Sequence, residues 1–162
     1  MKGIGRLSRL GWVYVLSVFC MGCATASGIE SQSRDLAIVD SWSGDFPVAQ
    51  LDLLPDGQRG SQVGYIGDKS IFTAVWQALM PGEMPPTVNF ERHLVVFSRN
   101  VKFYNRTKIF KVTISDGGVD VLAMETMSAL PIEDKVAMAM AVIPRDGIDF
   151  IRSGEIRIPV TR

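Results

Sequence analysis

The stretch from Lys108 to Met127 most constrains how this chain can fold. Two runs in which apolar and polar residues alternate, 108–115 and 118–127, flank Asp116-Gly117. An Asp-Gly pair between alternating runs is typical of a two-residue type I′ turn between antiparallel strands. The register then predicts the facing pairs Ser115–Gly118, Ile114–Val119, Val112–Val121 and Phe110–Ala123, with their apolar members on one buried face, and the ion pair Lys108–Glu125.

Other segments extend this hairpin to an α+β pattern. Asp68 is expected to cap a helix that Pro81-Gly82 ends. The apolar stripe of this helix is Ile71, Phe72, Val75, Trp76 and Leu79, and Trp76 is interpreted as a core residue. Further strands are expected over 46–51, 62–66, 93–98, 136–143, 148–151 and 155–160. We therefore predict an α+β fold with one amphipathic helix packed on an antiparallel β-sheet of about five to seven strands.

The N-terminus predicts export. Its first 22 residues carry only positive charges, at Lys2, Arg6 and Arg9, followed by an apolar run from Leu10 to Met21. This run would form a helix of roughly 18 Å, whereas a bilayer core is about 30 Å thick. Gly22-Cys23 resembles the end of a bacterial lipobox. We predict a lipoprotein signal peptide over 1–22, lipidation of Cys23, a flexible linker over 23–34 and a single α+β domain over 35–162.

A second cleavage site leaves another outcome open. Lipoboxes usually carry Leu three residues before the cysteine, and Cys20 stands there. Ala24-Thr25-Ala26 also fits an ordinary signal-peptidase site, which would release a soluble protein starting at Ser27. Ala24 follows Cys23 in place of the Asp that retains many lipoproteins in the inner membrane. We therefore expect outer-membrane anchoring facing the periplasm, with inner-membrane anchoring or secretion as alternatives.

Composition excludes one class of partner and one class of stabilising bond. Removal of Lys2, Arg6 and Arg9 leaves 14 basic against 17 acidic residues, a net charge of −3. A nucleic-acid surface would need a clustered basic excess. Cys20 and Cys23 are the only cysteines. The predicted domain therefore depends on its apolar core and contains no disulfide.

The chain shows no pattern of catalytic residues. His93, its only histidine, stands at the start of a strand and has no cysteine or Gly-x-Ser-x-Gly serine to activate. Glu133-Asp134 lies in a predicted turn, and Gly57-Gln58-Arg59-Gly60 lacks the lysine of a P-loop. We predict no catalytic, cofactor-binding or metal-binding residue and no enzymatic activity. Met138 and Met140 share a strand face and offer thioethers for Cu(I), although methionine also commonly fills cores.

One stretch resembles a known family. Trp76, the segment Pro86-Thr87-Val88-Asn89-Phe90, the strand Leu94-Val95-Val96-Phe97, the central hairpin and Ile143-Pro144 follow in the order seen in PrcB-like lipoproteins. These are accessory subunits of a dentilisin-type surface protease complex, and the likeness covers their C-terminal domain. Asn89 stands where that family usually has Asp. The resemblance implies a non-catalytic domain that binds or stabilises an envelope protein partner. A periplasmic small-ligand or copper-binding lipoprotein is the alternative.

Overall fold

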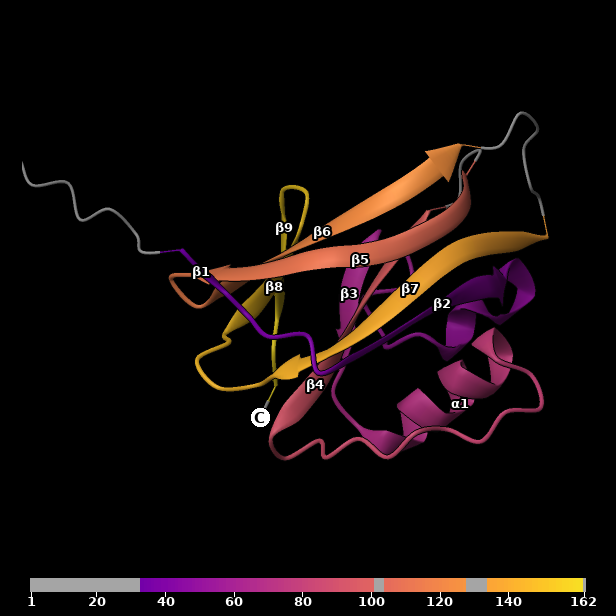
Figure 1. Ribbon diagram of the computed structural model, residues 1–162, viewed down its shortest axis with the longest axis horizontal. Helices are drawn as coiled ribbons and strands as arrows, with labels where there is room; N and C mark the ends of the chain where they lie inside the picture. Colours follow the sequence, from indigo (N-terminus) through magenta and orange to yellow (C-terminus); the bar gives the residue numbers. More distant parts are fainter. Residues whose placement is uncertain (1–32, 101–103, 128–133, 162) are drawn as a thin grey trace, which may run out of the picture. The chain divides into compact units, whose positions relative to one another are not determined.

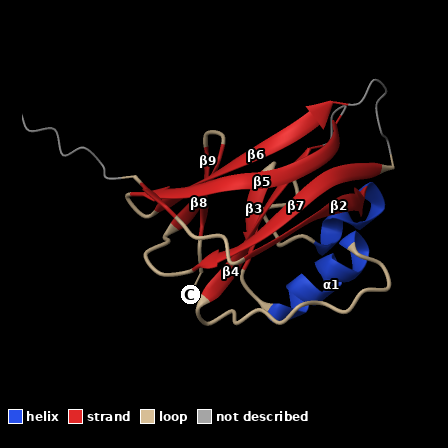
Figure 2. Ribbon diagram, viewed as in Figure 1, coloured by secondary structure: helices blue, strands red, loops and turns tan. Residues whose placement is uncertain are grey.

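The described part of the chain folds into two β-sheets and one α-helix. The computed structural model describes residues 33–100, 104–127 and 134–161. Five strands form an outer sheet in the order β1-β5-β6-β8-β9, and four form a central sheet in the order β2-β7-β4-β3 (Figures 1 and 2). The elements are β1 (Arg34–Asp35), β2 (Asp40–Pro47), the 3-10 helix η1 (Val48–Leu53), β3 (Val63–Ile66), α1 (Lys69–Leu79), β4 (His93–Asn100), β5 (Tyr104–Ser115), β6 (Gly118–Met127), β7 (Lys135–Pro144), β8 (Phe150–Ser153) and β9 (Ile156–Pro159).

The α+β class is confirmed, but the prediction of a single sheet of five to seven strands is wrong. The described residues contain nine strands in two sheets. All pairs in the central sheet are antiparallel, whereas β6 and β8 of the outer sheet pair in parallel. The compact unit that holds both sheets runs from Ser31 to Arg162.

The central sheet is buried on both faces. One face packs on the outer sheet and the other on α1, so that the fold has three layers (Figure 1). This explains why β4 and β7 read as continuous apolar runs, since alternation requires one solvated face. Towards the outer sheet lie Leu94, Val96, Ala139, Ala141 and Ile143, and towards α1 lie Val95, Phe97, Met138, Met140 and Val142.

The predicted helix and its cap are confirmed. The Asp68 carboxylate accepts hydrogen bonds from the Ile71 backbone N–H at 2.9 Å and from the Ser70 hydroxyl at 2.7 Å. Burial of this carboxylate disfavours its ionised form, but these hydrogen bonds outweigh burial and lower the pKa of Asp68. Trp76 is buried, and its ring meets that of Trp42 edge-on with 5.1 Å between centroids. Its predicted core position is therefore confirmed.

The predicted hairpin forms, but its register changes part-way along. Asp116 and Gly117 have φ angles of 49° and 73°, as a type I′ turn requires. The facing pairs Ser115–Gly118, Ile114–Val119 and Val112–Val121 are confirmed. A β-bulge between Ile109 and Lys111 then places Ile109 opposite Ala123. The predicted pairs Phe110–Ala123 and Lys108–Glu125 are wrong, because one extra residue in β5 shifts the alternation.

The first predicted strand is also misplaced. The expected strand over 46–51 is replaced by the end of β2 at Pro47 and by η1. Strand β2 lies earlier, over Asp40–Pro47, and pairs with β7 along its whole length. The other predicted strands are found within a few residues of their expected bounds.

Candidate functional site

Several residues singled out in the sequence lie outside the described residues or far from any shared site. Cys23 and Glu133 fall outside the described residues. Asp134 is exposed, and His93 is half-buried at the start of β4, where its backbone N–H donates to the Asn89 carbonyl at 2.9 Å. Among the described residues, no hydrogen bond or ion pair links His93 to Asp134. Within the described ranges, no group of three or more His, Cys, Asp or Glu side chains could hold a metal ion.

Among the described methionines, Met138, Met140 and the partly buried Met80 belong to one hydrophobic cluster, and two others lie on the surface. Met138 and Met140 are fully buried between the central sheet and α1, among aromatic and aliphatic side chains. Met124 is exposed on the outer sheet, and Met84 is exposed beyond α1. This distribution agrees with the packing interpretation of Met138 and Met140.

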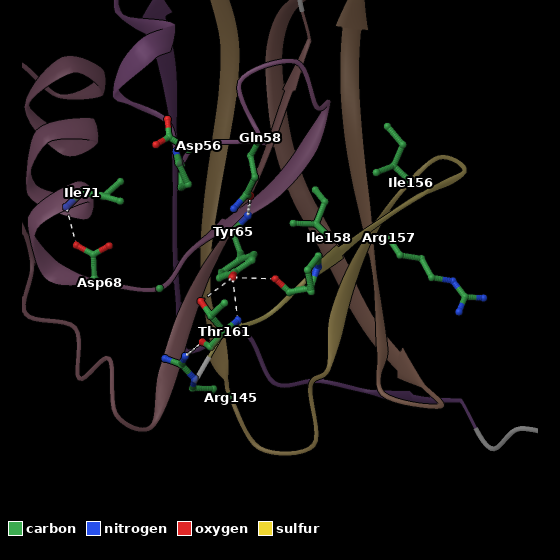
Figure 3. A pocket seen from close by; sticks show the side chains of 14 residues that line it. Asp56, Gln58, Tyr65, Asp68, Ile71, Arg145, Ile156, Arg157, Ile158 and Thr161 are labelled. Atoms are coloured by element: carbon green, nitrogen blue, oxygen red, sulfur yellow. Dashed lines mark hydrogen bonds between the residues drawn. The ribbon is translucent and has the colours of Figure 1, made fainter.

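A groove of about 630 Å³ lies between the N-terminus of α1 and β9 (Figure 3). Several of its polar groups bind other parts of the chain. The Tyr65 hydroxyl donates to the Pro159 carbonyl at 3.0 Å and accepts from the Thr161 N–H at 3.1 Å. The Arg145 guanidinium donates to the carbonyls of Phe90, at 2.9 Å, and Thr161. These contacts fasten the segment after β9 and give the groove a structural role.

The burial of Arg99 is a feature that the sequence analysis did not predict. Arg99 is 5% exposed and donates to the carbonyls of Ser61, at 2.8 Å, and Arg59. Burial lowers the pKa of its guanidinium. The neighbouring Gln58 is also buried and accepts from the Tyr65 N–H at 2.7 Å. The available signal in the sequence was a charged residue soon after the apolar run 94–97. The Arg99 side chain holds the loop before β3 against β4.

The outward side of the β5–β6 hairpin, here called the hairpin face, exposes a group of apolar side chains. We call Phe110, Leu122 and Met124 the apolar triad, and they are 61%, 56% and 59% exposed. Leu122 lies opposite Lys111 and next to the bulge that turns Phe110 outward, and Met124 lies opposite Lys108. The three side chains therefore share one side of two paired strands. Contiguous exposed apolar surface of this kind marks interaction sites more often than scattered residues do.

Positive charges border the apolar triad. Arg106 and Lys108 are exposed, and neither has an ion-pair partner among the described residues. The nearby acidic groups are already engaged. Asp35 pairs with Lys111 at 2.9 Å, and Asp120 pairs with Arg152. Beside its apolar side chains, the hairpin face thus carries two cations that pair with no acidic group in the described part of the chain.

Strand β6 also has a long free edge. It pairs with β8 only through Gly118–Phe150 and Val119–Ile151. From Asp120 to Met127, no described strand pairs with its far side, and Figure 1 shows this part of β6 at the border of the outer sheet. Backbone N–H and C=O groups alternate in direction along a strand. Since Ser115 and Gly118 flank a two-residue turn, the backbone groups of Val121, Ala123 and Glu125 point away from β5.

This edge carries two acidic residues, as another edge strand of the fold does, but no proline. Strand β2 borders the central sheet and carries Asp40, Asp45 and Pro47. Charges and proline on an edge strand discourage pairing with other chains. On β6, between Asp120 and Met127, the one further charge is Glu125, which accepts a hydrogen bond from the Asn100 amide at 2.8 Å. The β6 edge and the hairpin face are the candidate functional surfaces.

Comparison with protein-family models, curated proteins and solved structures gave no match. Among the described residues, no helix has the length and apolar character needed to cross a membrane. The PrcB-like resemblance therefore stays a prediction.

Proposed function

We propose that this chain is a bacterial envelope lipoprotein whose folded domain is non-catalytic and binds an envelope protein partner. The basic and apolar N-terminus and Gly22-Cys23 support lipid anchoring through Cys23. Ala24 after the lipidated cysteine supports residence in the outer membrane, facing the periplasm. The resemblance to PrcB-like lipoproteins supports an accessory role in a larger complex.

The observation that carries this proposal is the free edge of β6. An extended segment of a partner can add to such an edge as a further strand, because the unpaired backbone groups supply its hydrogen bonds. Val121, Ala123 and Glu125 offer these groups on alternate residues. The side chains of Val121 and Ala123 are only half-buried, so an added strand would complete the cover over the inner side of β6.

Site-specific photo-crosslinking in cells tests this proposal. A photoreactive amino acid at Thr126, which is exposed on β6, is expected to capture an envelope protein, whereas one at the exposed Gln77 of α1 is not. Ala123→Pro removes an edge N–H without breaking a bond to β5, and is expected to abolish the capture. Ala123→Ser keeps the N–H and serves as the matched control.

The outcomes separate the possible occupants of the edge. Capture from both Thr126 and Gln77, or capture that survives Ala123→Pro, would contradict strand addition at β6. A cross-linked product that contains only two copies of this chain would replace the envelope partner by a second copy.

A further inference from the structure

We propose that the hairpin face lies against an anionic phospholipid surface and orients the domain on the membrane that holds its anchor. This inference rests on the lipid-anchored placement proposed above and adds a second, non-covalent contact. Basic residues and exposed apolar side chains add to the membrane affinity that a lipid anchor provides.

The apolar triad supplies the part that enters the interface. Phe110, Leu122 and Met124 project from the same side of two paired strands and are more than half exposed. Such side chains are stabilised at the boundary between lipid headgroups and acyl chains. All three side chains lie on an exposed sheet face, so the surface of a bilayer can contact them at the same time.

The positive charges beside the apolar triad indicate that the lipid surface is anionic. Arg106 and Lys108 lie beside the triad without ion-pair partners among the described residues, although the chain after its predicted cleavage site has a net charge of −3. Their place on this face of an acidic protein favours an anionic surface. Stacking of two copies through the same face would bring Arg106 and Lys108 of both copies together, which like-charge repulsion opposes.

The path of the chain leaves the hairpin face within reach of the membrane that would hold the anchor. Strand β1 pairs with β5 through Arg34–Ile114 and Asp35–Thr113, so the chain enters the fold on the outer sheet itself. From Cys23, the segment 24–34 spans at most roughly 36 Å when fully extended. A tether of this length keeps the hairpin face at high effective concentration beside the bilayer. The free edge of β6 stays open at the side of the sheet for a protein partner.

Vesicle co-sedimentation of residues 31–162 tests the face apart from the anchor. This segment is the compact unit that contains both hydrophobic cores. We expect it to bind vesicles that contain phosphatidylglycerol much more tightly than phosphatidylcholine vesicles, with affinity falling as salt rises. Arg106→Gln and Lys108→Gln are each expected to weaken binding about fivefold.

Apolar variants identify which part of the surface meets the lipid. Leu122→Ser with Met124→Ser is expected to weaken binding by roughly tenfold. Ile156→Ser is the matched control, because Ile156 is 59% exposed on β9, outside the hairpin face. Equal losses of vesicle binding for the Leu122 and Met124 double variant and for Ile156→Ser would overturn the inference. Equal binding of the wild type to both kinds of vesicle would also overturn it.

A fluorescence measurement applies the test to the full lipidated chain in vesicles. Met124→Cys and Ile156→Cys each introduce one free thiol after Cys23 for an environment-sensitive dye. A blue shift at residue 124 alone is expected, and its absence would overturn the inference even in an anchored protein. Vesicle binding without capture of a partner would contradict only the proposed partner function. Capture of a partner without vesicle binding would contradict only the proposed membrane contact.

Discussion

The guanidinium of Arg99 donates from Nε to the carbonyl oxygen of Ser61 at 2.8 Å, inside the protein and without an ion-pair partner among the described residues. Arg99 also donates to the Arg59 carbonyl. In the described part of the chain, backbone carbonyls are the groups that compensate this charge, and one side chain from β4 holds the loop between η1 and β3.

Arg99→Met is expected to destabilise the fold by about 1–3 kcal/mol, because it leaves the buried Ser61 carbonyl and the partly buried Arg59 carbonyl without the Arg99 donor. Arg99→Lys is expected to cost less, since its ammonium can still donate to one carbonyl. Urea melts measure both effects. Arg92→Met is the control, because Arg92 is exposed, and a loss equal to that of Arg99→Met would show that the hydrogen bonds to the loop are unimportant.

Asp68→Ala is expected to cost about 0.5–2 kcal/mol at neutral pH, because it removes the cap of α1. The folded-state pKa of Asp68 lies below its ordinary value of 3.8. This group therefore stabilises the fold above pH 3.8, and the contribution disappears as pH falls through the depressed folded-state pKa. The stability difference between the wild type and Asp68→Ala should shrink in acid. A difference that grows below pH 3.8 would contradict this account.

Val112→Lys and Thr113→Lys are expected to have opposite outcomes. Val112 is buried between the sheets, so a lysine there should cost about 3 kcal/mol or more. Thr113 is half-exposed between Asp35 and Asp120 on the neighbouring strands, so Thr113→Lys should be nearly neutral. Chemical denaturation compares the two, and similar losses would contradict the one-sided burial of β5.

Cys23→Ala is expected to abolish labelling of the protein by a clickable fatty acid and to leave precursor or soluble protein. The reason is that the Gly22-Cys23 site requires the Cys23 thiol for lipid attachment. Density-gradient fractionation of the wild-type protein should place it with the outer membrane. Labelling that survives the substitution would exclude Cys23 as the lipidated residue, whereas a wild-type protein that takes up no label would favour cleavage after Ala26.

Sequence periodicity predicted those elements whose surroundings are simple. The α1 stripe has one buried side, and the Asp116-Gly117 turn depends on two residues only, so both follow from local rules. The burial of β4 and β7 on both faces depends on tertiary packing. Their continuous apolar runs fit a buried strand, but a run does not tell which layers cover it.

The candidate surfaces were harder to predict than the fold. The bulge in β5 moves Phe110 from an expected core position to the surface, and strict alternation cannot reveal an extra residue. The free edge of β6 depends on where β8 diverges after Val119, which is a matter of packing. Arg99 was visible as a charge in an apolar strand, but its carbonyl partners come from a loop nearly 40 residues earlier in the chain.

Between Ile109 and Lys111, β5 holds one residue that its ladder with β6 does not use, and a second irregularity lies between Tyr104 and Arg106. Ile109–Ala123 and Lys111–Leu122 are successive pairs on β6, so a chain without Phe110 would keep both pairs in place. The buried side chains Ile109 and Val112 would also keep their sides of the strand. Deletion of Phe110 should therefore preserve the unfolding midpoint and shrink the exposed apolar surface. In this hairpin, the interior and the surface can change independently by insertion or loss of a single residue.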